Sequence, residues 1–303
     1  MIDKLFPETF YRSLKKVPLN KVTEIRLRLN KKVLISIGQK YYYLSDEGLT
    51  GNENTALVVN KSLIDEIIKR ACESSVYAFN DQIKNGFITV LGGIRIGISG
   101  EAVIENGKIK TLKNINGLAI RIAHEIKGCS LPVLPYLFKE QFLNTLLISP
   151  PGAGKTTMIR DMLYQLSQKN YCYNVLLVDE RFEIANCFNG VATLDVGNFC
   201  DVLSGCDKKY SFENGVRSLK PDIIVTDEIS NVKDYESIEY LSSWGVSILT
   251  SIHAKNIEDI KCKKDFENLL KNKVFSRYVV LSNNGGPGHL EAIYDENLRY
   301  LNI

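Results

Sequence analysis

A chain of 303 residues, 45% of them hydrophobic, is long enough to bury two cores, so we expect two domains. Its 38 lysines and arginines nearly balance 35 aspartates and glutamates, which argues against a dedicated nucleic-acid binder. A charged start, seven cysteines without a Cys-x-x-Cys pair and no apolar run of bilayer length favour a reduced, cytosolic protein without disulfides, zinc site or membrane span.

The first half of the chain predicts a small α+β domain with a mostly antiparallel sheet. Amphipathic helices are expected over residues 7–16 and 60–73, and Ser62 can cap the second with Asp65 three residues on. Alternating apolar residues predict a strand over 24–29, hairpins over 33–44, 87–99 and 102–112, and a last strand over 120–122. The hairpins are expected to turn at Gly38-Gln39, Gly92-Gly93 and Asn106-Gly107.

The pattern breaks over residues 126–140, which hold one glycine and two prolines and are the candidate linker, with a short helix over 133–139. The expected domains are therefore 1–125 and 141–303. In the second, strands and helices alternate, which predicts a mostly parallel sheet with helices on both faces. The expected strands are 146–148, 174–179, 222–227, 246–250, 278–281 and 290–294, and the expected helices are 155–166, 211–219, 233–244 and 256–270.

The charge is divided unevenly between the two halves. Residues 1–138 hold 20 Lys and Arg against 13 Asp and Glu, a balance of +7, whereas residues 139–303 hold 18 against 22, a balance of −4. Two such halves would attract each other across a domain or subunit contact, although a chance distribution explains the numbers equally well.

The stretch Leu146-Leu-Ile-Ser-Pro-Pro-Gly-Ala-Gly-Lys-Thr-Thr-Met158 carries the clearest chemistry. A strand, a glycine turn, a lysine and a hydroxyl at the start of a helix form the phosphate cradle of a nucleoside triphosphatase. The glycines let backbone N–H groups face phosphate oxygens, Lys155 reaches the β- and γ-phosphates, and Thr156 ligates Mg²⁺. Ser149 stands where the strict pattern has glycine, and its small side chain is compatible with the turn. The residues expected to bind ATP are Pro151, Gly152, Ala153, Gly154, Lys155, Thr156 and Thr157.

Two predicted strands of the second half end in Asp-Glu, at Asp179-Glu180 and at Asp227-Glu228. Phosphoryl transfer needs a carboxylate near Mg²⁺ and another that orients the attacking water, and the carboxyl ends of parallel strands lie over the ligand crevice. We assign Asp227 to the metal and Glu228 to the water, with Glu180 as a second acidic contributor to catalysis. The reverse assignment of the two pairs stays open.

His253 is expected at the carboxyl end of the next strand, beside Thr250 and Ser251, where it suits contact with the γ-phosphate or the water. A core or surface histidine is the alternative. Several arginines are candidates for neutralising phosphate charge, but each also suits a structural ion pair or an exposed sheet face. They are Arg181 and Arg217 in the second half, and Arg26, Arg28, Arg95 and Arg121 on predicted strands of the first, of which Arg95, Arg121 and Arg181 are our candidates for the nucleotide site.

These residues together resemble the family of stage III sporulation protein AA of endospore-forming bacteria. The matching stretches are Glu24–Arg28, Ser75–Phe79, Gly92–Gly97, Ile120–Ala123, Ser149–Thr157, Val178–Ala185, Asp201–Leu203, Arg217–Asp222, Asp227–Ile229 and Gly286–Gly288. The chain departs from the family pattern at Ile94, where His is usual, at Phe182, where Ser is usual, and at Ser230 and Ala254, where Gly is usual. None of these departures removes a residue type that contacts phosphate.

The wider similarity is to the hexameric AAA+ or RecA-like ATPases of type II and type IV secretion. It implies that Asp179-Glu180-Arg181 is the acidic box, Asp227-Glu228 the Walker B segment and Thr250–His253 the histidine box. It also implies a RecA-like P-loop domain after the α+β domain, ATP and Mg²⁺ as cofactors, and a ring, expected to be hexameric. Its place would be the mother-cell cytoplasm, where it docks on small integral membrane proteins of a channel to the forespore.

The leading hypothesis is therefore an ATP-hydrolysing motor of such a channel. A nucleotide-gated regulatory or scaffolding module with little intrinsic turnover is the alternative. An ATPase that translocates nucleic acid is disfavoured by the near-neutral charge, and a GTPase by the lack of an Asn-Lys-x-Asp motif.

Overall fold

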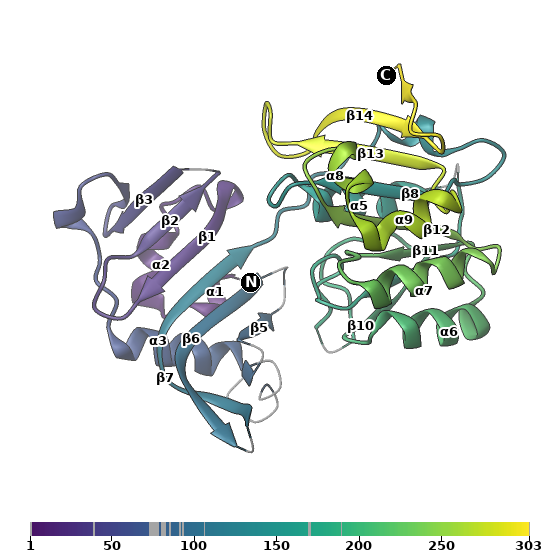
Figure 1. The fold of residues 1–303 in the computed structure, drawn as a ribbon. Coiled ribbons are helices and arrows are strands. Elements are labelled where there is room, and N and C mark those ends of the chain that lie inside the picture. The colour runs from purple at the N-terminus through teal and green to yellow at the C-terminus, as the bar shows by residue number, and fades with distance from the viewer. Residues whose placement is uncertain are drawn as a thin grey trace. The chain divides into compact units, whose positions relative to one another are not determined.

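The computed structural model describes residues 2–38, 40–72, 79, 83–84, 86–90, 92, 94–105, 107–168, 171–188 and 190–302 (Figure 1). The chain forms two compact units. The first contains Met1–His124 and Asn186–Thr193, and the second contains Glu125–Ala185 and Leu194–Ile303. The assignment of Asn186–Thr193 to the first unit has no counterpart in the sequence pattern, and the domain boundaries expected from the sequence stay a prediction.

Over the residues that the structure describes, the first unit combines an antiparallel sheet with α-helices. Its strands are β1 (Val22–Arg28), β2 (Leu34–Ile37), β3 (Lys40–Ser45), β4 (Gly48–Thr50), β5 (Phe87–Val90), β6 (Ile94–Glu105) and β7 (Lys108–Ile122), in the order β4-β3-β2-β1-β7-β6-β5. Its helices are α1 (Ile2–Leu5), α2 (Glu8–Leu14) and α3 (Lys61–Ala71). All paired neighbours run antiparallel, as predicted.

The alternation of β1 explains why this sheet has one apolar face. Ile25 and Leu27 are fully buried in the same core as residues of all three helices, such as Leu5 and Leu14. Successive side chains of a strand point to opposite faces, so Glu24, Arg26 and Arg28 lie on the other side. Helices therefore cover one face of the sheet, and charged residues of β1 lie on the opposite face.

The structure corrects two local predictions in this unit. Asn60, and not Ser62, caps α3, since its side chain accepts a hydrogen bond from Leu63 N–H at 2.8 Å. The pairing of β5 with β6 confirms the predicted hairpin over 87–99. The predicted hairpin over 102–112 and the predicted strand over 120–122 are not separate elements but parts of one long hairpin of β6 and β7, because the ladder continues past Gly100 through a bulge. A Cβ at Gly100 would lie 2.7 Å from the Lys113 carbonyl oxygen, so only glycine fits there. Gln39, Gly93 and Asn106 of the predicted turns lie outside the described residues.

The second unit is built on a sheet of order β10-β9-β11-β12-β8-β13-β14-β15. The strands are β8 (Thr145–Ser149), β9 (Val175–Asp179), β10 (Cys200–Ser204), β11 (Ile223–Thr226), β12 (Ser247–His253), β13 (Arg277–Ser282), β14 (His289–Asp295) and β15 (Tyr300–Leu301). The helices are α5 (Lys155–Leu166), α6 (Lys208–Leu219), α7 (Val232–Ser242), α8 (Ile257–Lys261) and α9 (Glu267–Lys271). The six strands β10, β9, β11, β12, β8 and β13 pair in parallel with their neighbours in this order. The strands β14 and β15 close the sheet by antiparallel pairing.

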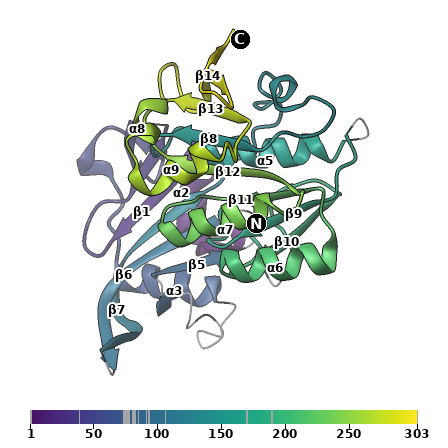
Figure 2. The ribbon, with the colours of Figure 1, turned by 45° about the vertical axis from the view of Figure 1, so that its right-hand side comes forward.

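Helices cover both faces of this parallel sheet (Figures 1 and 2). Residues of α6 to α9 share one core with Leu146, Leu176 and Ile224, which alternate along their strands. The intervening residues, such as Leu147 and Leu177, are equally buried and face the opposite side, which α5 covers. Burial on both faces explains the nearly continuous apolar runs from which these strands were predicted.

The predicted helix over 256–270 is wrong as one element. The chain instead forms α8, a short 3₁₀ turn over Lys264–Phe266 and α9. Phe266 at the break is fully buried and stacks on Phe275 with ring centroids 6.3 Å apart, so tertiary packing outweighs the helical pattern. The strands β10 and β15 had no counterpart among the predicted elements.

Gly215 seats α6 closely on the sheet and provides a test of this packing. A Cβ built there would lie 2.2 Å from Cδ2 of the fully buried Leu176. Gly215→Val is therefore expected to destabilise the protein by about 1–3 kcal/mol through overpacking. Asn214→Val, at the neighbouring exposed position of the same helix, is the control. Urea unfolding measures both variants, and equal midpoints would contradict this packing.

Candidate functional site

The loop between β8 and α5 has the backbone of an anion cradle. Gly152 and Gly154 adopt left-handed φ angles of +76° and +84°, which favour glycine. Gly154 is the N-cap of α5 and no side chain caps the helix. The N–H groups and the partial positive charge of this helix start are therefore available to an anion. The structure thus forms the strand, turn and helix that the sequence predicted at residues 146–166.

The glycine-rich turn Gly285–Gly288, which joins β13 and β14, braces this loop. Gly288 N–H donates a hydrogen bond to the Ala153 carbonyl oxygen at 2.9 Å. A Cβ at Gly154 would lie 2.9 Å from Gly288 N, so the two glycines permit a close backbone approach. The sequence pattern places Gly286–Gly288 among the stretches that resemble the family, but it does not predict this contact with the phosphate loop.

Three predicted site residues form a chain of contacts at the carboxyl edge of the parallel strands. Nζ of Lys155 lies 2.5 Å from Nδ1 of His253 and 3.1 Å from its Nε2, and that Nε2 lies 3.1 Å from Oε2 of Glu228. The tautomer with its proton on Nε2 fits both contacts, since Nδ1 then accepts from Lys155 and Nε2 donates to Glu228. Burial lowers the pKa of Lys155, against the opposing charge of Glu228. Arg181 Nη1 lies 3.9 Å from Glu228 and extends the chain.

Asp227, directly after β11, is buried, and one of its two carboxylate oxygens accepts hydrogen bonds. Oδ1 accepts hydrogen bonds from Glu228 N–H at 2.7 Å and from the Thr226 hydroxyl at 3.3 Å. Among the described residues Oδ2 has no hydrogen-bond partner. Burial raises the pKa of Asp227 to about 6, although the charges of Lys208 and Arg181 oppose the shift. Ser251 of β12 donates to the Asp227 backbone carbonyl and fixes the end of the strand.

A magnesium ion fits this donor set. The unsatisfied Oδ2 of Asp227 is a carboxylate oxygen that lacks a protein partner, and Mg²⁺ is usually held by one or two carboxylates, hydroxyls and substrate phosphates. Thr156, in the first turn of α5, provides the hydroxyl expected from the sequence. Within the described part of the chain, no three His, Cys, Asp or Glu side chains form a metal site on their own.

The first acidic pair is divided between two environments. The carboxylate of Asp179 is fully buried and accepts hydrogen bonds from Glu183, Ile184 and Ala185 N–H groups at 2.8–3.2 Å. These hydrogen bonds hold the loop after β9 in place. Arg160 of α5 also donates a hydrogen bond to this loop, at the Ile184 carbonyl oxygen. Glu180 points elsewhere and contacts Lys208.

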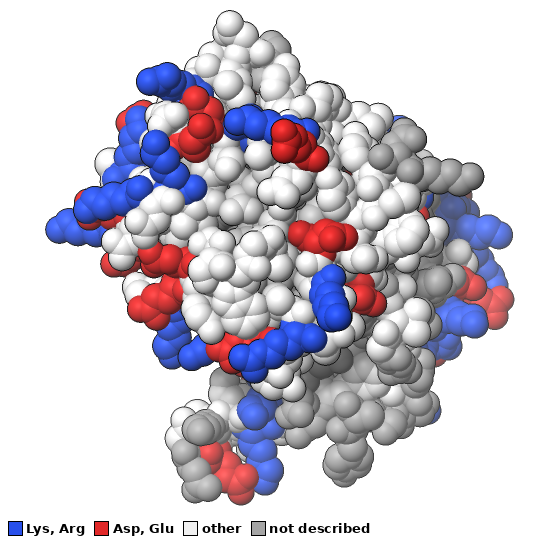
Figure 3. Space-filling view, turned by 90° about the vertical axis from the view of Figure 1, so that its right-hand side faces the viewer, with Lys and Arg blue, Asp and Glu red and all other residues white. Residues whose placement is uncertain are grey.

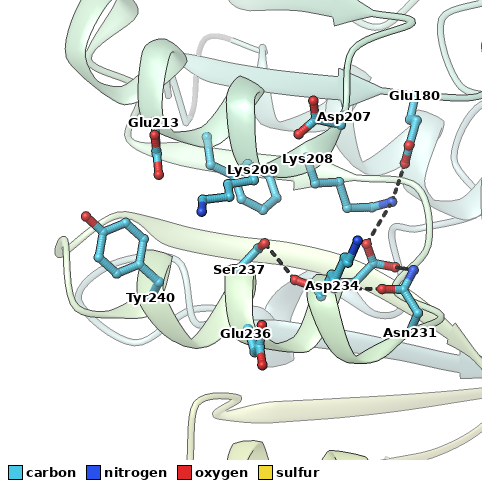
Figure 4. A pocket seen from close by; sticks show the side chains of 12 residues that line it. Glu180, Asp207, Lys208, Lys209, Glu213, Asn231, Asp234, Glu236, Ser237 and Tyr240 are labelled. Atoms are coloured by element: carbon cyan, nitrogen blue, oxygen red, sulfur yellow. Dashed lines mark hydrogen bonds and ion pairs between the residues drawn. The ribbon is translucent and has the colours of Figure 1, made fainter.

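Lys208 is a site residue that sequence reasoning missed. Its side chain is only 5% exposed, and Nζ lies 2.6 Å from Glu180, 3.6 Å from Asp234 and 3.8 Å from Asp227. Burial lowers its pKa, but the hydrogen bond to Glu180 and the two aspartates outweigh burial and raise it. Lys208 also lines a groove of about 910 Å³ between α6 and α7 (Figure 4). A lysine that opens a helix has no recognisable sequence pattern, so no motif pointed to it.

Four of the five remaining arginine candidates, all except Arg28, have a local partner among the described residues. In the first unit, Arg121 and Arg26 pair with Glu24 at 3.3 and 2.8 Å, and Arg95 lies over the Phe87 ring at 4.1 Å. In the second, Arg217 lies 5.9 Å from the centre of the Trp244 ring. A role for any of them at a nucleotide stays a prediction.

Among the helices of the described residues, none has the length and apolar character of a membrane span.

Sequence comparisons identify close relatives. The profile of the family described as sporulation stage III, protein AA matches residues 3–301. Stage III sporulation protein AA of Bacillus subtilis (strain 168) is 34% identical over 303 residues, which cover 98% of this chain and 95% of that protein. The uncharacterized protein ycf45 of Cyanidium caldarium is 27% identical over 276 residues, which cover 90% of this chain and 71% of that protein.

Structural comparisons identify proteins of the same fold. The ATPase DotB of Legionella pneumophila matches with a TM-score of 0.60 at 11% identity, over 91% of this chain and 76% of that chain. The pilus retraction motor PilT with bound ADP matches with a TM-score of 0.58 at 13% identity, over 88% and 76% of the two chains. At these identities the similarity shows the fold alone. It confirms the predicted α/β fold with a RecA-like P-loop sheet after an α+β part.

The raised pKa of Asp227 predicts how stability depends on pH without nucleotide or metal. The folded chain holds this proton up to about pH 6, whereas the unfolded chain loses it near the ordinary value of 3.8. The contribution of Asp227 to the free energy of unfolding is therefore full below about pH 4 and falls as the pH rises through 6. Asp227→Asn lacks this loss, so its stability relative to wild type is expected to rise by roughly 2–3 kcal/mol between about pH 4 and pH 7. Urea unfolding in EDTA measures the difference, and parallel pH curves would contradict it.

Proposed function

The chain belongs to the family of stage III sporulation protein AA, and we propose that it is an Mg²⁺-dependent ATPase that acts in sporulation. One observation carries this proposal. The glycine loop, Lys155, His253, Glu228 and Asp227 come from separate strand ends and lie together at one edge of the sheet. A cradle for phosphates, a carboxylate for the metal and a carboxylate for the water are the parts that phosphoryl transfer needs.

Each residue has a distinct proposed role. The N–H groups of residues 152–157 surround the phosphates, with Pro151 at the start of the loop, and the ammonium of Lys155 turns from His253 towards the γ-phosphate. Thr156 and Asp227 hold Mg²⁺, which neutralises phosphate charge when it is bound. Glu228 orients the attacking water and accepts its proton. His253, released from Lys155, is then placed to sense the γ-phosphate, and Arg181, Arg95 and Arg121 are candidates for the charge that completes the site.

We further propose that the chain works as a ring-shaped motor on membrane partners. Support comes from the fold, which it shares with a protein described as a pilus retraction motor. In this proposal the ring is hexameric, lies in the mother-cell cytoplasm and acts on integral membrane proteins of a channel to the forespore. In the face of the molecule drawn in Figure 3, basic and acidic side chains lie among each other, which favours protein partners over nucleic acid.

One observation favours the alternative, a nucleotide-gated module with little turnover of its own. Glu228 is engaged by His253 and lies near Arg181, and Lys155 is engaged by the same histidine. These contacts must rearrange before Glu228 can activate water. ATPase assays of the purified chain, with and without membrane proteins from the same cells, separate the two functions, because only the motor has substantial turnover alone.

Lys155→Ala is expected to lower kcat by about 10²–10³-fold, since it removes a charge that stabilises the γ-phosphate in the transition state. Lys255→Ala, at an exposed lysine just beyond β12, is the matched control and should retain wild-type turnover. Phosphate release from Mg²⁺-ATP measures both. Equal rates for the two variants would refute the site.

Glu228→Gln is expected to retain ATP without hydrolysing it, because the amide keeps the shape of the side chain but cannot accept the proton from water. Glu180→Gln is expected to slow turnover about tenfold and still to hydrolyse the bound ATP. Filter binding of labelled ATP and single-turnover hydrolysis distinguish retention from cleavage. The opposite pattern, with ATP trapped only by Glu180→Gln, would reverse the roles of the two acidic pairs.

A further inference from the structure

We propose that Lys208 is a positioning residue of the ATPase site, which holds Glu180 in place by linking it to Asp227 and Asp234. This inference rests on the proposed function, since it assigns Lys208 to the same reaction. It concerns a residue outside the phosphate loop and outside both acidic pairs.

The placement of Lys208 depends on the start of α6. Asp207 caps this helix by accepting a hydrogen bond from Tyr210 N–H at 3.0 Å, so Lys208 is its first residue. The side chain then reaches from α6 between Glu180 and Asp234 (Figure 4). Glu180 follows β9, Asp227 follows β11 and Asp234 belongs to α7. One cation therefore contacts acidic residues from three separate elements.

The distances rank these three contacts. Glu180 Oε2 accepts a hydrogen bond from Nζ at 2.6 Å, whereas Asp234 and Asp227 form ion pairs at 3.6 and 3.8 Å. Charge-assisted hydrogen bonds are the stronger kind, so Glu180 is the carboxylate that Lys208 orients most directly. The two aspartates are nearly buried and hold the ammonium from the other side. A buried ammonium is retained only where carboxylates compensate its charge, and here it has three.

Asp234 and Asp227 are themselves fixed, which gives Lys208 a rigid support. Oδ2 of Asp234 accepts hydrogen bonds from Ser230 N–H at 2.8 Å and Asn231 Nδ2 at 3.0 Å, and its Oδ1 faces Lys208. Asp227 Oδ1 is held by Glu228 N–H at 2.7 Å. The segment that carries Glu228 is therefore tied to both aspartates. Glu180 has a more exposed side chain, at 38%, and depends on Lys208 for its orientation.

A double-mutant cycle tests whether Lys208 acts through Glu180. Lys208→Met is expected to lower kcat about tenfold, with the KM for Mg²⁺-ATP changed less than about twofold. In the Glu180→Gln background the same substitution is expected to have no further effect on kcat, because the carboxylate that Lys208 orients is gone. Lys208→Arg keeps the charge and should recover part of the loss. Lys209→Met removes an exposed charge one residue away and is the matched control, with wild-type kcat.

Two measurements accompany the kinetics. Urea unfolding shows which variants fold, and the affinity for a fluorescent ATP analogue is expected to stay within about twofold of wild type. If Lys208→Met does not fold, Lys208→Gln, which is neutral but polar, takes its place in the cycle. A loss of kcat that multiplies with that of Glu180→Gln overturns the proposal, as does unchanged kcat in a folded variant that lacks the charge of Lys208. A wild-type chain without ATP binding would instead overturn the proposed function.

Discussion

Parallel pairing of β9, β11, β12 and β8 is the constraint on which the site depends. In a parallel sheet all carboxyl ends lie at one edge, so residues distant in sequence meet there. The register places His253 opposite Ser149, the last residue before the phosphate loop. A shift of the pairing register by one residue would move the side chains of a strand to the opposite face of the sheet. It would also separate His253 from Lys155.

Charge compensation is the second theme of this edge. Lys155 faces His253 and Glu228, while Lys208 faces Glu180, Asp227 and Asp234. Buried charges are tolerated only where each has a partner, and each of the two ammonium groups has its own. An incoming phosphate tail would compete with the histidine for Lys155 and leave the Lys208 contacts intact. In this proposal, phosphate replaces the contacts of Lys155 at this edge, whereas the contacts of Lys208 stay and support the acidic residues.

The sequence carried the fold class and the phosphate loop because both depend on local patterns. Apolar runs with glycines predicted β8 and α5, and the two Asp-Glu pairs were found because they follow such runs. Contacts between distant residues left no pattern of this kind. The Gly288 brace on Ala153, the Lys208 contacts and the break at Phe266 depend on tertiary packing, which overrides local preference. Asn60 and Ser62 are both suitable N-cap residues and lie two positions apart, so the sequence alone does not decide which of them caps α3.

The position of β8 also bears on how the molecule is made. Both of its neighbours in the sheet, β12 and β13, come much later in the chain, and the turn that braces the phosphate loop comes later still. During translation β8 leaves the ribosome with neither edge paired, and its apolar residues stay unpaired until β12 and β13 have emerged. The binding loop is therefore completed only after Gly288 has been synthesised, so a nascent chain that stops short of Gly288 has no finished cradle.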